Sequence, residues 1–207
     1  LNYNYYKENG LKPVSCLLLA LLLTTGRRLK ECGSLTWALF KQGENPRLEL
    51  KKTKTSKKNN KLVFKLGEEA VNILKLIEKD RLNNPDSSFY FDINDPRNKY
   101  IFPSKAYGRK IKGGKSEALH LQDPGATWNC VLKLSGVERH MKIHSTRHSF
   151  ATNFYRVTKD LKALAEALGT TEAQASKYAK LDGEPVVEWI NKIKFFDDEK
   201  VVLKQVN

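Results

Sequence analysis

The segment Ile143–Tyr155 brings an arginine together with two of the chain's four histidines, as His144, Arg147 and His148. Metal binding, phosphate binding and ordinary packing all use such residues. His144 and Arg147 stand one turn apart at the start of an expected helix, so both side chains leave it in one direction. An imidazole and a guanidinium beside the outward-pointing N–H groups of a helix N-terminus suit a phosphate. Because an HxxR pair also arises by chance, the rest of the chain must decide.

A zinc site is the first alternative, because His140, His144 and His148 follow one another at intervals of four residues. The sequence contains neither an HExxH motif nor a cysteine pair, and Lys142 and Arg147 add positive charge that opposes a cation. Its three cysteines are widely spaced, which argues against a disulfide framework and indicates a reducing compartment. We therefore expect no metal and no cofactor, and we interpret His140 as a packing or surface histidine.

The charge of the chain indicates a polyanionic partner. Lys and Arg number 37 against 23 acidic residues, a formal net charge of +14. The ranges 51–65 and 97–115 each hold seven basic residues and no acid. Such runs usually form a solvated surface, but two of them on separate loops favour a surface that follows a phosphate backbone. The candidate DNA contacts are Lys51, Lys52, Lys57, Lys58, Arg109, Lys110 and Lys112.

Nucleic acid is preferred to a membrane as that partner, because the basic runs fall on a hairpin and a loop instead of an amphipathic helix. The most apolar run, 14–23, has about half of the ~20 residues that a membrane span needs, so it predicts a buried helix.

The first half of the chain predicts helices around a small sheet. Between 12 and about 40 the pattern is helix, tight turn at Gly26, then a second helix that breaks near Gly33. Alternating apolar residues on both sides of a lysine-rich tip predict a β-hairpin over 47–66. A helix over 67–82 follows, with two glutamates in its first turn, where the helix dipole favours them.

The second half predicts a long loop and then helices. Residues 83–126 are expected to be mostly loop, with a short extended piece at 99–104. A short helix closed by Gly136, the helix that carries HxxR, and a helix that ends at Gly169 come next. Thr171 and Gln174 form a capping-box pattern that begins another helix. With neither repeats nor a linker, we expect one α+β, mostly helical domain with a small antiparallel sheet.

Three segments become specific when they are considered together: "LLLTTGRRLKECGSLTW", "HSTRHSFAT" and "LAEALGTTEAQASKYAKL". They resemble the first arginine box, the HxxR box and the nucleophile segment of the tyrosine recombinases, the phage-integrase family. With the lysine hairpin after the first box, the resemblance covers about 12–181. It implies a catalytic domain of the DNA breaking-rejoining type over 1–207, in which 182–207 is a tail that docks in cis or in trans. It also implies an N-terminal core-binding domain that this chain lacks.

The resemblance assigns five catalytic residues. Arg28 and Arg147 match the two arginines that grip the non-bridging oxygens of the scissile phosphate. Lys54 matches the hairpin lysine that protonates the departing 5′-hydroxyl, although Lys52 and Lys57 are close to it. His144 matches the acid-base histidine. Tyr178 matches the nucleophile that holds DNA as a 3′-phosphotyrosine.

Supporting roles follow from the same match. Glu31 is expected to orient Arg28, and His148 to pack beside the site or support it. Thr170 stands where the family usually has a histidine or tryptophan that donates a hydrogen bond to the phosphate, and the interval to Tyr178 is one residue shorter than usual. Loss of such a donor costs ~3 kcal/mol of transition-state stabilisation. Tyr155 is an alternative nucleophile, but it lies too close to the start of the HxxR helix.

The resemblance implies an integrase that exchanges DNA strands at a specific site without metal or ATP. The expected partners are double-stranded DNA, three further copies of the protein in a tetramer on DNA, and an accessory directionality protein; a monomer in isolation is also compatible. The expected location is the cytoplasm, in association with the nucleoid or other DNA, and the expected gene is prokaryotic or phage-encoded. Three alternatives stay open: a DNA-binding relative that has lost its chemistry, a type IB topoisomerase that rotates strands, and, least favoured, a metal-dependent nuclease.

Overall fold

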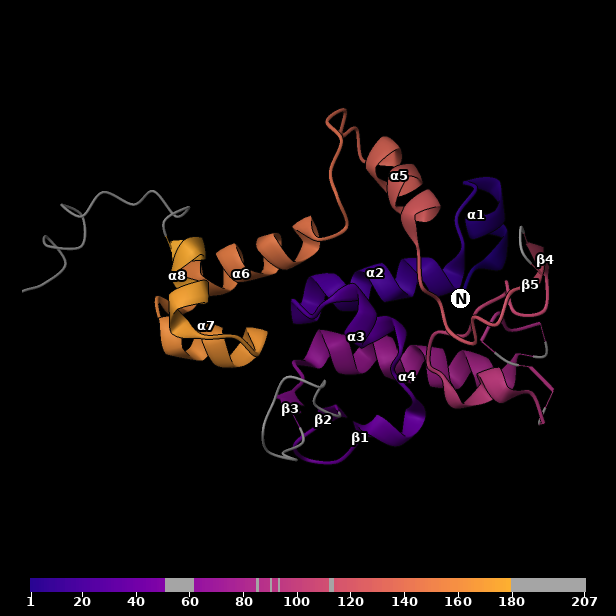
Figure 1. The fold of residues 1–207 in the computed structure, drawn as a ribbon, viewed down its shortest axis with the longest axis horizontal. Helices are drawn as coiled ribbons and strands as arrows, with labels where there is room; N and C mark the ends of the chain where they lie inside the picture. Colours follow the sequence, from indigo (N-terminus) through magenta and orange to yellow (C-terminus); the bar gives the residue numbers. More distant parts are fainter. Residues whose placement is uncertain (51–61, 85, 90, 93, 112–113, 180–207) are drawn as a thin grey trace, which may run out of the picture.

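The computed structural model describes residues 1–50, 62–84, 86–89, 91–92, 94–111 and 114–179. At its centre lies α2 (Pro13–Thr25), which packs against four other helices (Figure 1). They are α3 (Leu29–Gly33), α4 (Glu68–Asn83), α5 (Gly125–Leu134) and α6 (Ser145–Thr158). The apolar run that is too short for a membrane is therefore a buried helix, as predicted. None of the described helices is long and apolar enough to cross a membrane.

The ends of α2 follow from its sequence. Pro13 occupies the first turn, where its missing N–H would have no partner in any case. Gly26 ends the helix with φ 61°, a left-handed conformation that glycine adopts without strain. A Cβ at Gly26 would lie 2.3 Å from the Phe150 ring of α6. The glycine therefore stops α2 and also allows α6 to approach.

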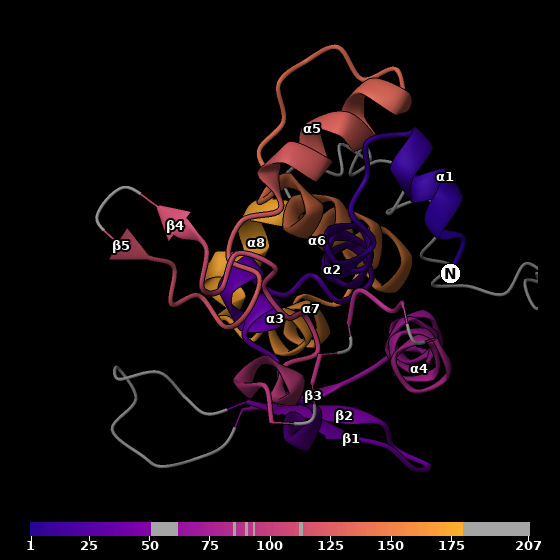
Figure 2. The same cartoon turned by 90° about the vertical axis from the view of Figure 1, so that its right-hand side faces the viewer.

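The predicted hairpin is present and belongs to a three-stranded antiparallel sheet. The strands are β1 (Phe40–Lys41), β2 (Arg47–Leu50) and β3 (Leu62–Lys65), in the order β1-β2-β3. Leu48 pairs with Phe64 and both are buried, so the period-two pattern selects the inward face. The sheet and α5 lie on opposite sides of α2 (Figure 2). The sequence did not predict β1, because two residues carry no periodic signal.

α4 begins with Glu68 and Glu69 in its first turn and buries Ala70, Leu74 and Ile77, as predicted. One helix was missed: α1 (Tyr3–Glu8) precedes α2, and a helix of six residues shows little periodicity.

Most of 83–126 is loop, as expected, but the core holds its extended piece. Ile101 and Phe102 are fully buried, and Ile101 N–H donates to the Leu35 carbonyl at 2.9 Å. Isolated bridges pair Thr36 with Tyr100 and Pro103 with His120. Short elements that the sequence did not predict are the 3₁₀ turns η1 (Trp37–Leu39) and η2 (Pro96–Lys99), and the pair β4 (Lys110–Ile111) and β5 (Gly114–Lys115).

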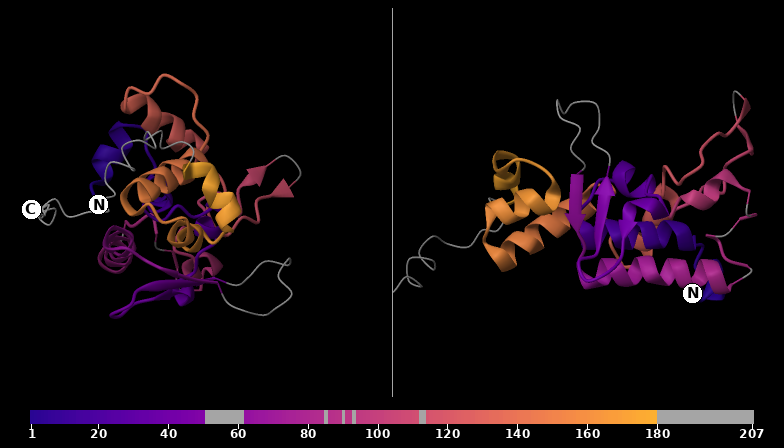
Figure 3. Two further views of the ribbon diagram at one scale, coloured as in Figure 1. Left: turned by 90° about the vertical axis from the view of Figure 1, so that its left-hand side faces the viewer. Right: turned by 90° about the horizontal axis from the view of Figure 1, so that it is seen from below.

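The last described helices, α6, α7 (Leu161–Leu168) and α8 (Glu172–Ala179), form a group at one end of the molecule (Figure 3). They enclose a second hydrophobic cluster, which includes Leu164, Leu168 and Tyr178 and is separate from the cluster around α2. Gly169 has φ 61° and ends α7 where the sequence predicts its cap. The tail 182–207 falls outside the described residues.

α8 begins as the capping pattern predicts, because the Thr171 hydroxyl accepts from Gln174 N–H at 3.3 Å. The second half of the predicted capping box is replaced: the Gln174 side chain accepts a hydrogen bond from the Thr170 hydroxyl.

Candidate active site

Arg147 connects three parts of the fold. It lies in the first turn of α6 and is only 4% exposed. Its Nη1 donates to the Gly26 carbonyl at 2.8 Å, and its Nη2 donates to the Leu168 carbonyl at 3.1 Å. The guanidinium thus joins the end of α2 to the end of α7. Burial lowers the pKa of Arg147, and the nearby charge of Arg28 lowers it further.

Tyr178 reaches this arginine from α8. Its side chain is 9% exposed, and its proximity to Arg147, chiefly through its charge, raises the pKa of the arginine. The Tyr178 ring centroid lies 5.4 Å from that of His148. Two motifs more than twenty residues apart in the sequence therefore meet in one cluster.

Arg28 lies at the start of α3 on the more exposed side of this cluster. Its side chain is 49% exposed, and its Nη1 lies 3.2 Å from Glu31 Oε1. Its backbone N–H donates to Glu31 Oε2 at 3.1 Å. The expected contact between Glu31 and Arg28 is thus present, and it leaves about half of the Arg28 side chain exposed to solvent.

The two histidines of the HxxR helix are neighbours of Tyr178 and of each other. The His144 and His148 rings are 4.9 Å apart in an edge-to-face arrangement. Desolvation is the largest cause that lowers the pKa of His144. The positive charges of His148, Arg147 and Arg28 lower this pKa further. The imidazole is therefore biased toward its neutral form, which can accept a proton.

The structure does not place His140, His144 and His148 on one helix face, although their spacing in the sequence allows it. His144 is the residue that precedes α6, so His140 is not on that helix and the three-histidine face does not form. Arg147 turns inward while His144 stays exposed. Among the described residues, no group of three or more His, Cys, Asp or Glu could hold a metal ion.

Lys54 and several basic candidates lie outside the described residues: Lys51, Lys52, Lys57, Lys58 and Lys112. The segment 51–61 joins β2 to β3. Arg109 and Lys110 are described and exposed; Arg109 precedes β4 and Lys110 is its first residue.

Thr170 follows the end of α7, but its hydroxyl donates to Gln174 Oε1 within α8. In this conformation the side chain is engaged by a neighbour of its own segment. Tyr155, the alternative nucleophile, packs beside the α6–α8 cluster, with Lys159 Nζ 5.9 Å from its ring.

Arg27 is the residue that the sequence interpretation missed. The sequence assigned it no role beside Arg28, but its side chain is 2% exposed and donates to the same Leu168 carbonyl as Arg147. Its Nε lies 3.3 Å from Glu31 Oε2. The sequence did contain a signal for this role: Arg27 is a charged residue in the segment that joins two helices expected to pack together. The cluster thus holds three guanidiniums and one carboxylate, an excess of positive charge that suits a phosphodiester.

The solved structures that resemble this chain include site-specific recombinases and a transposon integrase. The chain matches XerH site-specific recombinase in a post-cleavage complex with palindromic difH substrate (TM-score 0.60, 20% identity, 86% of this chain and 45% of that one). It matches XerA recombinase (TM-score 0.59, 19% identity, 88% and 62%). It also matches the Tn1549 transposon integrase with circular intermediate DNA (TM-score 0.52, 18% identity, 78% and 52%). The chain therefore spans about half the length of these proteins.

No curated protein sequence matches the chain. The model of the family described as "Phage integrase family" matches residues 3–183, which include both arginine boxes and Tyr178. The fold, the cluster around Arg147 and this match agree with the resemblance found in the sequence: the chain belongs to the phage integrase family.

Proposed function

We propose that this chain is the catalytic domain of a site-specific tyrosine recombinase that cuts and rejoins duplex DNA. The observation that carries the proposal is the buried Tyr178 of α8, which lies beside Arg147 and 5.4 Å from the His148 ring of α6. Arg28 and His144 lie in the same cluster. A phenol is a weak nucleophile unless a base takes its proton and positive groups stabilise the developing charge. This cluster supplies both.

In the proposed reaction the Tyr178 oxygen attacks phosphorus and the bond from phosphorus to the 5′-oxygen breaks. His144 takes the phenol proton in its neutral form. Lys54 protonates the leaving 5′-oxygen. Arg28 and Arg147 hold the non-bridging oxygens through the pentacoordinate transition state. The reverse step, with the 5′-hydroxyl of another strand as nucleophile, releases the tyrosine.

This exchange needs neither ATP nor a metal ion, because one phosphate ester is converted into another and arginines can supply the positive charge. Glu31 would keep Arg28 in orientation, since both its carboxylate oxygens contact that residue. His148 would support the Tyr178 ring, which it contacts.

The partners of this chain are proposed from its membership of the phage integrase family. The solved XerH and Tn1549 chains are complexes with DNA. We propose duplex DNA as substrate, four protomers on two duplexes, a core-binding domain beyond this chain, the tail 182–207 as a docking segment, and an accessory directionality protein. Lys51, Lys52, Lys57, Lys58, Arg109, Lys110 and Lys112 would contact the DNA backbone. Action on a prokaryotic chromosome, phage or mobile element follows from the same family.

A DNA-binding relative without chemistry is the second candidate, and one observation favours it. The Thr170 hydroxyl, which occupies the position of a phosphate donor in the family, is bonded to Gln174. The two candidates differ in one measurable product, the covalent adduct.

The test is covalent capture from a pool of randomised duplexes, each with a nick that lets the short cleaved strand diffuse away. Two proteins are tested separately: the chain itself, and any longer natural form that contains it. Complexes that survive detergent are digested, the attached residue is found by peptide mass, and the DNA is sequenced. We expect attachment at Tyr178 and one enriched sequence. DNA binding without any adduct would favour the second candidate, and adducts without an enriched sequence would favour a topoisomerase.

A further inference from the structure

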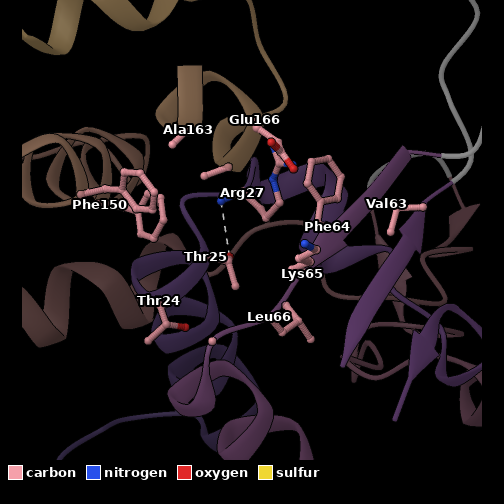
Figure 4. A pocket seen from close by; sticks show the side chains of 13 residues that line it. Thr24, Thr25, Arg27, Val63, Phe64, Lys65, Leu66, Phe150, Ala163 and Glu166 are labelled. Carbon is pink, nitrogen blue, oxygen red and sulfur yellow. Dashed lines mark hydrogen bonds between the residues drawn. The ribbon is translucent and has the colours of Figure 1, made fainter. Parts of the chain in front are cut away.

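Arg27 is buried between the two halves of the candidate site. Its guanidinium carbon lies 3.5 Å from the centroid of the Phe64 ring in β3. It lines a cavity of about 370 Å³ between the end of α2, β3, α6 and α7. Figure 4 shows Arg27 beside Phe64 and Glu166, with its backbone N–H bonded to the Thr25 hydroxyl.

The Arg27 guanidinium makes two polar contacts, one with α7 and one with α3. Its Nη2 donates to the carbonyl of Leu168, the last residue of α7. Carbonyls at a helix end lack an intrahelical partner and carry the negative end of the helix dipole. Its Nε lies 3.3 Å from Glu31 Oε2, the oxygen that also accepts from the Arg28 N–H.

These contacts link the two arginine boxes to the nucleophile. Arg147 donates to the same Leu168 carbonyl, so two guanidiniums hold one oxygen at the end of α7. Leu168 and Tyr178 belong to one hydrophobic cluster, and α7 packs on α8. A shift of the Leu168 carbonyl therefore moves the helix that carries Tyr178.

We infer that Arg27 is a positioning residue: by tying Leu168 to Glu31, it sets where Tyr178 stands relative to Arg28 and Arg147. Its effect on catalysis rests on the proposed function. Its effect on the placement of α8 does not, because that follows from contacts within the chain.

Packing alone does not account for an arginine at this position. Burial lowers the pKa of Arg27 to about 10, and Glu31 offsets part of that effect. Its Nη1 has no hydrogen-bond partner within the described residues, and its Nε meets Glu31 Oε2 as an ion pair without hydrogen-bond geometry. Apolar side chains often replace a buried ion pair without loss of stability, so a methionine against Phe64 should pack well. The contacts of the guanidinium, rather than its volume, are what a methionine would lose.

The experiment compares Arg27→Met with Arg81→Met. Arg81 also lies over an aromatic ring, Trp37, and has a buried Nε without a partner, but it is on α4. Amide hydrogen exchange over 169–178 is measured first, without DNA. We expect exchange about tenfold faster in Arg27→Met, equivalent to ~1.4 kcal/mol, and unchanged in Arg81→Met.

Cleavage is measured next, on the sequence captured as described above. At saturating DNA, Arg27→Met should form the adduct about tenfold more slowly, with the midpoint of DNA binding unchanged. Arg27→Lys should recover part of the rate, because an ammonium reaches one of the two oxygens but not both. Were Arg27→Met not to fold, Arg27→Lys would carry the test, with faster exchange expected than in the wild type.

The outcomes separate the two proposals. Unchanged exchange over 169–178 in both Arg27 variants overturns the positioning role, whether or not the wild type cleaves DNA. Binding and cleavage that fall together with the folded fraction overturn it as well. Faster exchange in a wild type that forms no adduct keeps the positioning role and rejects the proposed function.

Discussion

Tyr178 of α8 lies beside Arg147 of α6, close enough that the tyrosine raises the pKa of the guanidinium. Both side chains are at least nine-tenths buried. The phenol thus lies against an arginine of its own chain. For the proposed reaction, this geometry predicts attack in cis, by the protomer that also binds the phosphate.

The nucleophile is tested by Tyr178→Phe. The ring keeps its contact with His148, so the variant should fold and bind DNA as the wild type does. It should form no covalent adduct, because the attacking oxygen is gone. Tyr155→Phe is the matched control and should retain the adduct in the same gel assay. An adduct that persists in Tyr178→Phe and disappears in Tyr155→Phe would reverse the assignment.

The pH dependence follows from His144. Its pKa is lowered below the ordinary value of 6.5, mainly by desolvation, so the folded protein binds this proton less well than the unfolded chain. The contribution of His144 to stability is therefore complete above pH 6.5 and decreases as the pH falls toward the lowered pKa. The rate of adduct formation should rise as the pH increases through the lowered pKa of His144, so the midpoint of the rise should lie below pH 6.5 and the rate should be constant at higher pH. His144→Asn should remove that step from the rate profile, whereas His140→Asn should leave it in place.

Arg147 is expected to affect stability and catalysis together. In Arg147→Lys one ammonium cannot reach both the Gly26 and Leu168 carbonyls, and an unpaired buried carbonyl costs ~1–3 kcal/mol of unfolding free energy. Adduct formation should fall by about 10²–10³, the usual effect of removing one transition-state donor. Urea unfolding and single-turnover cleavage measure the two effects. Arg139→Lys, at an exposed position, should change neither; equal stability in Arg147→Lys would contradict the role of the two carbonyls.

Gly169 is expected to matter for two separable reasons. Its φ is +61°, and a Cβ there would lie 2.9 Å from the Phe64 ring and 3.1 Å from Arg27 Nη1. Gly136 has φ +67° with nothing within 4 Å of its Cβ position. In urea unfolding, Gly136→Ala should cost ~1–2 kcal/mol from backbone strain alone. Gly169→Ala should cost more, because the aromatic ring must also move; equal costs would show that the ring yields freely.

The exposed residues Arg109 and Lys110 test the proposed DNA surface. If each neutralises one phosphate, Arg109→Ala and Lys110→Ala should each reduce the slope of log K against log salt by about 0.9. Fluorescence anisotropy across a salt series measures this slope. Lys75→Ala, exposed on α4, should leave the slope unchanged. Unaltered slopes for Arg109 and Lys110 would exclude this loop from the interface.

Local pattern was sufficient to predict the long elements of this fold. The apolar run over 14–23, the cap at Gly26, the stripe of α4 and the cap at Gly169 all depend on neighbours within a few residues, and each was found in the structure. β1 and α1 were missed because elements of two and six residues contain too few side chains to show a period. The family boxes were also legible in the sequence, because their residue types and order are characteristic.

The sequence by itself determined the elements, the excess of positive charge and the identities of the residues that resemble a recombinase site. Only the tertiary structure decided that Arg147 turns inward to two carbonyls, that His140 is off the helix of His144, and that Arg27 meets Arg147 at Leu168. The physical reason is that helix and strand periods express contacts between near neighbours. The direction of a buried guanidinium depends instead on which carbonyls from distant segments are left without a partner when the helices pack.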